Sequence, residues 1–365
     1  MIAILVYAAQ PAAACSIPVF RYALERWMAS PYEIVVFRHG ELSRGETATL
    51  ESAGKALANI EIRTVDLRAD IAEEDQELWK AQEKTGDLPW VVVRFPGSDA
   101  KSPIAWSGKL SREGLLAALE SPARRELARR LMAGDSGVWV VLSSDDKESD
   151  DRLEKTLVRE LGRLEKTMTL PEIAVDGPQL RSSLPLKLKF SVLRVARDDP
   201  REAALVRMLR VAEPELAQSD EALVVPVIGR GRAVSALMGS RADEERIGAF
   251  AEFICGQCSC EVKDLNPGID LLMTANWDLI FEEGRDPAIE ETPRGAPGKR
   301  VAIAGPSPAT VPVLGKEGGV VVVERRVESP VVERHEGRKW RMAGIALAAV
   351  IVLLSGVAVF RGRRI

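Results

Sequence analysis

The chain has 365 residues, a formal net charge of −4 and 46% hydrophobic residues. This length suggests two domains, and the apolar content is sufficient for sizeable cores. Without a basic excess the charge argues against a nucleic-acid-binding protein, and two histidines are too few for a histidine-rich metal site.

The first segment, residues 1–14, predicts a signal peptide. Its apolar run 2–9 is followed by three alanines at 12–14, a small-residue pattern that favours cleavage before Cys15. No lysine or arginine precedes the apolar run, so a first β-strand over the same residues remains an alternative. A cysteine directly after the cleavage point also leaves lipidation of Cys15 open.

Residues 15–133 predict a first α/β domain. The pattern of Ser43 with Glu46 three residues later is a capping box, which marks a helix start. The basic segment 121–132 indicates either an anionic partner or a solvated connecting helix, and we favour the helix. The expected elements in chain order are a helix over 16–29, a strand over 32–37, a helix over 43–58, a strand over 60–67, a helix over 73–82, strands over 90–95 and 104–110, and helices over 111–120 and 121–132.

Residues 134–283 predict a second α/β domain in which the same order of elements begins again. The segment 229–239, GRGRAVSALMG, resembles a weak phosphate loop. Because it joins two strands rather than a strand and a helix, we expect no nucleotide cofactor. The expected elements are a strand over 138–142, a helix over 151–168, a strand over 186–195, a helix over 199–209, strands over 223–228 and 233–238, and helices over 243–255 and 269–281.

The repeated order of strand, helix, strand, helix, two adjacent strands and helix resembles two thioredoxin-like domains in tandem. That fold places a proline, usually cis, before the third core strand, where this chain has Pro89. Its enzymes carry Cys-x-x-Cys where the first strand meets its helix, because a helix N-terminus lowers a thiol pKa. Here those junctions read HGELS at 39–43 and SSDDK at 143–147, without cysteine. The resemblance therefore implies redox-inactive domains, with His39 in a surface loop.

Three cysteines, Cys255, Cys258 and Cys260, form the densest chemical signal in the chain. In an oxidising compartment two of the three are expected to form a disulfide. A zinc site is disfavoured because closed sites normally need four ligands and the remaining cysteine is the distant Cys15. Disulfide exchange is an alternative, although the segment follows a helix C-terminus, whose partial negative charge raises a thiol pKa. Inert free thiols are a further alternative.

The C-terminal part predicts a linker over 284–337, rich in proline and glycine, and a membrane anchor over 338–365. The uncharged run from Met342 to Phe360 is long enough, at about 1.5 Å per residue, to cross a hydrocarbon core about 30 Å thick. Trp340 and basic residues flank it, as is usual at membrane interfaces. The linker has little expected structure, but its valine runs, such as 320–323, leave a strand or a partner-binding segment open.

These features predict a single-pass membrane protein whose bulk lies on the extracytoplasmic side, with a short basic cytoplasmic tail. The stretches CSIPVFRYALERW at 15–27 and CSCEVKDLNPGIDLLM at 258–273 resemble uncharacterised membrane-anchored bacterial proteins, a likeness that implies no activity. We expect a non-enzymatic binding or scaffolding protein with an unknown protein partner, no cofactor and no nucleic acid. The alternative function is a thiol–disulfide oxidoreductase that uses Cys255, Cys258 and Cys260.

Overall fold

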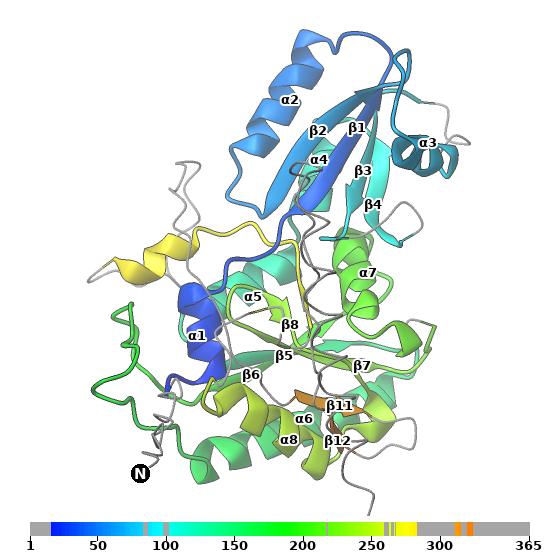
Figure 1. The fold of residues 1–365 in the computed structure, drawn as a ribbon. Helices are drawn as coiled ribbons and strands as arrows, with labels where there is room; N and C mark the ends of the chain where they lie inside the picture. The colour runs from blue at the N-terminus through cyan, green and yellow to red at the C-terminus, as the bar shows by residue number, and fades with distance from the viewer. Residues whose placement is uncertain are drawn as a thin grey trace, which may run out of the picture. The chain divides into compact units, whose positions relative to one another are not determined.

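The computed structural model describes residues 16–82, 87–97, 102–216, 218–258, 263, 266 and 268–282, and the backbone of strands 311–314 and 320–323. Within these residues, eight α-helices accompany one four-stranded and one six-stranded sheet in a mixed α/β fold (Figure 1). No helix among them is long and apolar enough to cross a membrane. The predicted signal peptide, the predicted membrane span from Met342 to Phe360 and most of the predicted linker lie outside the described residues.

The first sheet has the strand order β2-β1-β3-β4, in which β1 and β2 are parallel and the other neighbouring pairs are antiparallel. The Leu88–Pro89 peptide bond before β3 is cis, as the sequence resemblance implies. The predicted capping box of Ser43 and Glu46 is confirmed at the start of α2. The elements are β1 (Tyr32–Arg38), α2 (Arg44–Gly54), β2 (Ile60–Asp66), α3 (Glu73–Lys80), β3 (Trp90–Arg94), β4 (Ile104–Lys109) and α4 (Arg112–Leu119).

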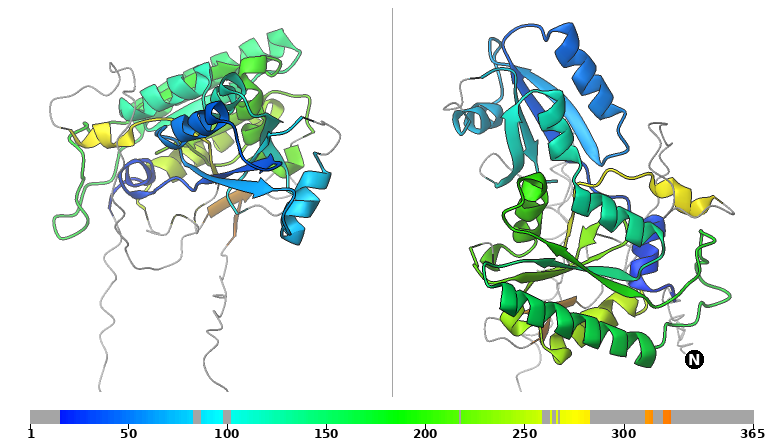
Figure 2. Two further views of the ribbon diagram at one scale, coloured as in Figure 1. Left: turned by 90° about the horizontal axis from the view of Figure 1, so that it is seen from above. Right: turned by 180° about the vertical axis from the view of Figure 1, so that it is seen from behind.

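The second sheet repeats this connectivity with the order β10-β8-β7-β5-β6, and a short strand β9 also pairs with β7. Strands β5 and β6 are parallel, whereas β5 and β7 are antiparallel. Helices α6 and α8 cover one face of this sheet, and α5 and α7 cover the other (Figures 1 and 2). The elements are α5 (Pro122–Met132), β5 (Gly137–Leu142), α6 (Lys147–Thr167), β6 (Phe190–Val195), α7 (Ala203–Val211), β7 (Leu223–Ile228), β8 (Arg232–Ala233), β9 (Leu237–Met238), α8 (Glu244–Cys255) and β10 (Ile269–Asp270).

Helix α5 belongs to a core that both sheets share, so its predicted role as a solvated connecting helix is wrong. Its residues Leu127 and Leu131 are buried in one apolar cluster with Ile34 of the first sheet and Val140 of the second. The first arginine of the segment, Arg124, is only 2% exposed. The residues described up to Val323 fall within one compact unit.

The N-terminal helix α1 (Val19–Arg26) packs on the second sheet, although the sequence boundaries place it in the first domain. Phe20 and Ala23 lie in an apolar cluster with Trp139 of β5 and Ile254 of α8. Helical periodicity identified the element correctly but carried no information about which sheet it covers. The residues that would have shown this lie more than a hundred positions away along the chain.

Residues 269–276 form an extended segment, here called the strap, which joins the two sheets. The helix predicted over 269–281 is therefore wrong, except for a 3₁₀ turn at Trp277–Phe281. The strap begins as β10 of the second sheet and then forms a bridge from Thr274 to Ala58, just before β2. The Met273 amide donates a hydrogen bond to the side-chain oxygen of Asn59 at 2.9 Å, and the Asn59 side-chain nitrogen donates one to the Leu271 carbonyl at 3.2 Å. These long-range partners favour extended backbone over a helix.

The predicted linker contains two short paired strands, β11 (Val311–Leu314) and β12 (Val320–Val323). They pair antiparallel, with Val311 opposite Val323 and Leu314 opposite Val320. Of the alternatives for the valine runs, the structure therefore has a strand at 320–323.

Candidate functional site

The cysteine segment begins at the C-terminal end of α8. Cys255 is a free thiol, 1% exposed, and burial raises its pKa to about 12. A helix C-terminus presents carbonyl groups rather than N–H groups, so it gives a thiolate no stabilisation. Cys258 is also buried, and Cys260 lies outside the described residues. The predicted disulfide between two of Cys255, Cys258 and Cys260 stays a prediction.

The segment before α1 lies beside the cysteine segment. Pro18 and Gln257 form an antiparallel bridge, flanked by hydrogen bonds from the Val19 amide to the Gly256 carbonyl at 3.0 Å and from the Cys258 amide to the Ile17 carbonyl at 2.9 Å. The stretches 15–27 and 258–273 are thus neighbours in space at Ile17 and Cys258. Their composition gave no sign of this pairing.

A second contact, between the residues just after α1 and the stretch 258–273, centres on Asp270, which no sequence motif marked. Its carboxylate accepts hydrogen bonds from Lys263 Nζ at 2.7 Å, from Arg232 Nη1 at 3.1 Å and from the Ser30 amide at 2.8 Å. Burial alone would raise the pKa of Asp270, but the hydrogen bonds from Lys263 and Ser30 outweigh burial and hold this pKa below its usual value. Lys263 also donates to the Met28 carbonyl at 2.7 Å. We call these residues the Asp270 cluster.

The arginine side chains of the segment that resembles a phosphate loop bind groups within the protein. Arg230 Nε donates to the Leu24 carbonyl at 2.9 Å, and Arg232 binds Asp270. Gly231 has a φ of +92°, and a side chain there would lie 2.6 Å from Met273 Cγ. The glycine therefore permits close packing against the strap. The segment holds α1 and the strap in place.

The two strand–helix junctions hold no thiol. At the first junction His39 is exposed, which confirms its predicted place in a surface loop. At the second, the buried Asp150 accepts hydrogen bonds from Ser144 Oγ at 2.8 Å and from Arg194 Nη2 at 3.0 Å. The second junction is therefore occupied by a carboxylate that is hydrogen-bonded to a hydroxyl and a guanidinium, with no thiol.

No cluster of three or more His, Cys, Asp or Glu residues that could hold a metal ion occurs in the described part of the chain. No protein-family model matches the sequence, and no curated protein matches it either. The geometry alone therefore supports two statements about the candidate residues. Cys255 is unsuited to thiolate chemistry, and the Asp270 cluster fixes the N-terminal segment against the strap.

Proposed function

We propose that this chain is a membrane-tethered, envelope-facing binding or scaffolding protein built from two redox-inactive thioredoxin-like units. The observation that carries the proposal is the chemistry of the places where a thioredoxin-like enzyme would need a reactive thiol. The first junction carries the exposed His39, and the second carries the hydrogen-bonded pair of Asp150 and Arg194. The thiol of Cys255 is buried. None of these groups supplies an accessible thiolate.

The thioredoxin-like assignment is supported by the connectivity of both sheets. In each, a strand, a helix and a parallel strand are followed by a helix, antiparallel strands and a closing helix. The strand order β2-β1-β3-β4 recurs as β6-β5-β7-β8. A fold can keep its architecture after losing its chemistry, so this likeness implies no activity.

A binding or scaffolding role is supported by the way the two units are joined. The shared core through α5 and the strap from β10 to Ala58 make the relative position of the two sheets fixed rather than hinged. A fixed pair of units presents a preformed surface to a partner, which lowers the conformational entropy lost on binding. The tether itself rests on the sequence, through the apolar run from Met342 to Phe360 and the signal-like residues 1–14.

The chemical half of the proposal predicts no disulfide reductase activity. Full-length protein, assayed with a small dithiol donor and a protein disulfide substrate, should give a rate indistinguishable from the uncatalysed one, because the described residues offer no accessible thiolate. An active thioredoxin in the same assay is the positive control. Robust turnover that disappears in Cys258→Ser, while the thermal melt stays unchanged, would instead assign an oxidoreductase that uses the cysteine segment.

The membrane half predicts topology. In cells that express the full chain, the protein should remain with the membrane fraction after alkaline carbonate extraction, since a spanning helix is retained there. Protease added outside spheroplasts should digest the α/β unit and spare the basic tail after Phe360. Complete protection of the α/β unit would place it in the cytoplasm and favour the strand interpretation of residues 2–9.

A further inference from the structure

Arg230, in the turn between β7 and β8, differs from the other buried arginines. Three of the others form ion pairs with carboxylates, namely Arg21, Arg94 and Arg232. Arg124 donates to three backbone carbonyls and to Ser121 Oγ. Arg230 is 9% exposed, yet it forms no ion pair with a described residue. Buried charges in proteins are normally paired, so this cation lacks its expected partner among the described residues.

The Arg230 side chain is held at the C-terminal end of α1. The Gly231 amide donates to the Ile228 carbonyl at 3.1 Å, which places Arg230 in a β-turn. Its Nε donates to the Leu24 carbonyl at 2.9 Å, and its Nη1 lies 3.4 Å from Met28 Sδ, a weak acceptor. Its Nη2 forms no hydrogen bond with a described residue. A helix end supplies only about half a negative charge, so part of the Arg230 charge is not balanced.

Arg181 is a second cation at this end of α1, and it lies in the loop 168–189 before β6. The strand predicted over 186–195 begins only with β6, and the loop takes up the difference. The Arg181 amide donates to the Glu25 carboxylate at 2.7 Å, which places the residue beside the last turn of α1. Its side chain is exposed and forms no hydrogen bond or ion pair with another described residue.

The carboxylates around this place do not neutralise the two arginines. Glu25 and Asp270 each pair with two other cations. Burial lowers the pKa of Arg230, the charge of Asp278 raises it, and the like charge of Arg181 lowers it further. Asp278 is exposed and forms no ion pair with either arginine. One distant carboxylate therefore faces two cations, and the end of α1 keeps a positive charge.

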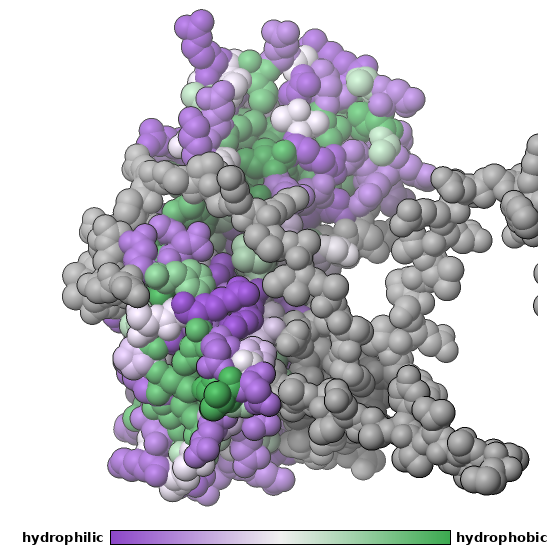
Figure 3. Space-filling view, turned by 60° about the vertical axis from the view of Figure 1, so that its left-hand side comes forward, coloured by the Kyte–Doolittle hydropathy of each residue, from purple (hydrophilic) through white to green (hydrophobic). Residues whose placement is uncertain are grey.

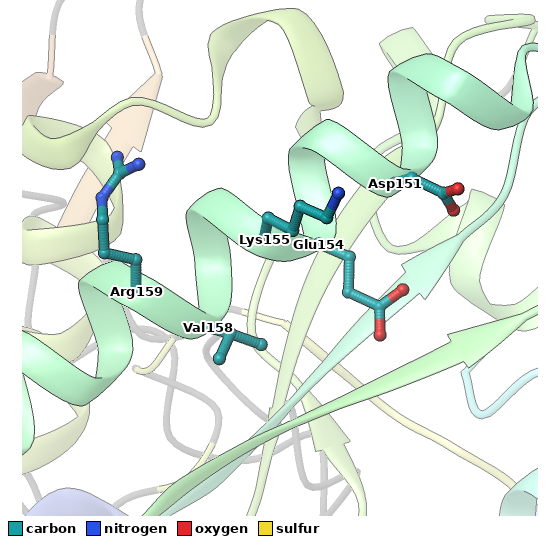
Figure 4. A pocket seen from close by; sticks show the side chains of 5 residues that line it. All are labelled: Asp151, Glu154, Lys155, Val158 and Arg159. Atoms are coloured by element: carbon teal, nitrogen blue, oxygen red, sulfur yellow. The ribbon is translucent and has the colours of Figure 1, made fainter.

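These groups come from separate segments of the chain, which is what a ligand site needs. The hollow on α6 in Figure 4 is lined, among the described residues, by α6 alone, and its Arg159 already lies 3.0 Å from Glu160. The face turned forward in Figure 3 carries α1 and gathers strongly hydrophilic residues near its middle. Of these two places, the end of α1 is the one that offers unpaired cations from two segments to a ligand.

We propose that Arg230 and Arg181 bind a phosphate group at the C-terminal end of α1. Because Nε is bonded to Leu24, Arg230 cannot hold a planar carboxylate through Nε and Nη2 together. A phosphate group has several acceptor oxygens, so it can accept single hydrogen bonds from Arg230 Nη2 and from the Arg181 guanidinium. The site uses arginine side chains rather than the backbone N–H groups of a phosphate loop.

Free phosphate and the head group of an anionic phospholipid share this chemistry. The Met28 side chain beside Arg230 is 69% exposed and offers an apolar contact that only a lipid can use. Short-chain dihexanoyl-phosphatidylglycerol, compared with inorganic phosphate, distinguishes the two sources. Tighter binding of the lipid that Met28→Ser removes would assign a lipid head group, and equal or weaker binding of the lipid would assign free phosphate.

The test is isothermal titration calorimetry of the full chain with inorganic phosphate, in a non-ionic detergent at low salt. Wild type should bind with a dissociation constant of about 1 mM or lower, as expected for two charge-assisted hydrogen bonds. Arg181→Ala and Arg230→Lys should each raise this constant by about tenfold. Arg181 is exposed, so Arg181→Ala should keep the wild-type thermal melt. Arg152→Ala on α6, which alters an exposed arginine beside Glu148, is the matched control and should bind phosphate as wild type does.

Two further titrations separate a phosphate site from an arginine that only caps α1. Asp278→Asn should lower the dissociation constant by about two- to threefold, because it removes a charge that repels the anion. Acetate should bind about tenfold more weakly than phosphate, since it carries less charge and fewer oxygens. No phosphate binding by wild type would overturn the proposal. So would an affinity that both arginine variants leave unchanged, or acetate that binds as tightly as phosphate.

Discussion

Replacing Arg124 by alanine is expected to lower the free energy of unfolding by about 3–5 kcal/mol. Its guanidinium donates to the carbonyls of Ala118 at 2.9 Å, Leu272 at 3.1 Å and Ala117 at 3.2 Å. Ala117 and Ala118 lie in the last turn of α4, where carbonyls have no helical N–H partner, and Leu272 lies in the strap. Burial lowers the pKa of Arg124 to about 10, which still leaves it charged at neutral pH.

The matched control is the next residue. Arg125 is exposed and pairs with Glu120 at the surface, so Arg125→Ala should change the free energy of unfolding by less than about 0.5 kcal/mol. Denaturant titration of both variants beside wild type measures the difference. If Arg124→Ala stays as close to wild type as its neighbour, Arg124 does not link α4, α5 and the strap as we describe.

The parts of the fold that depend on short-range signals were predictable. Ser43 and Glu46 form their capping box within three residues, and the strands at Tyr32–Arg38 and Gly137–Leu142 are apolar runs that need no distant information. The strap was not predictable, because its apolar residues happen to follow helical spacing. Its conformation is set by Asn59 and Ala58, some two hundred positions earlier.

In the candidate site, too, local sequence spacing identified some residues, but contacts between distant segments could not be predicted. Cysteine spacing alone identified Cys255 and Cys258, whereas their burial depends on the core around Trp139. Nothing in the sequence indicated that Arg232 and Asp270 pair, since they lie in different segments of the chain. Their pairing arises only when β8 and β10 become adjacent strands. A helical arginine such as Arg124 likewise gave no sign that it faces carbonyls of two other segments.

Replacing Asp270 by asparagine is expected to destabilise the protein by about 3–5 kcal/mol at neutral pH, because the change leaves two largely buried cations without their counter-charge. Arg232 and Lys263 both approach the Asp270 carboxylate, at 3.1 and 2.7 Å. Asparagine keeps the shape of the side chain, so the loss reports charge rather than packing. Asp278→Asn, which alters an exposed carboxylate in the same C-terminal segment, is the control and should change stability by less than about 0.5 kcal/mol.

The pH dependence of this loss follows from the lowered pKa of Asp270. The folded pKa lies below the unfolded value of about 3.9, so the stabilisation is fully present above that value and declines as pH falls through the folded pKa. The difference in unfolding free energy between wild type and Asp270→Asn should therefore stay constant from about pH 7 to 5 and shrink below about pH 4. Comparing the two proteins at each pH cancels the titration of the other carboxylates. A difference that is small at neutral pH, or that does not change in acid, would show that the carboxylate charge does not hold Arg232 and Lys263 in place.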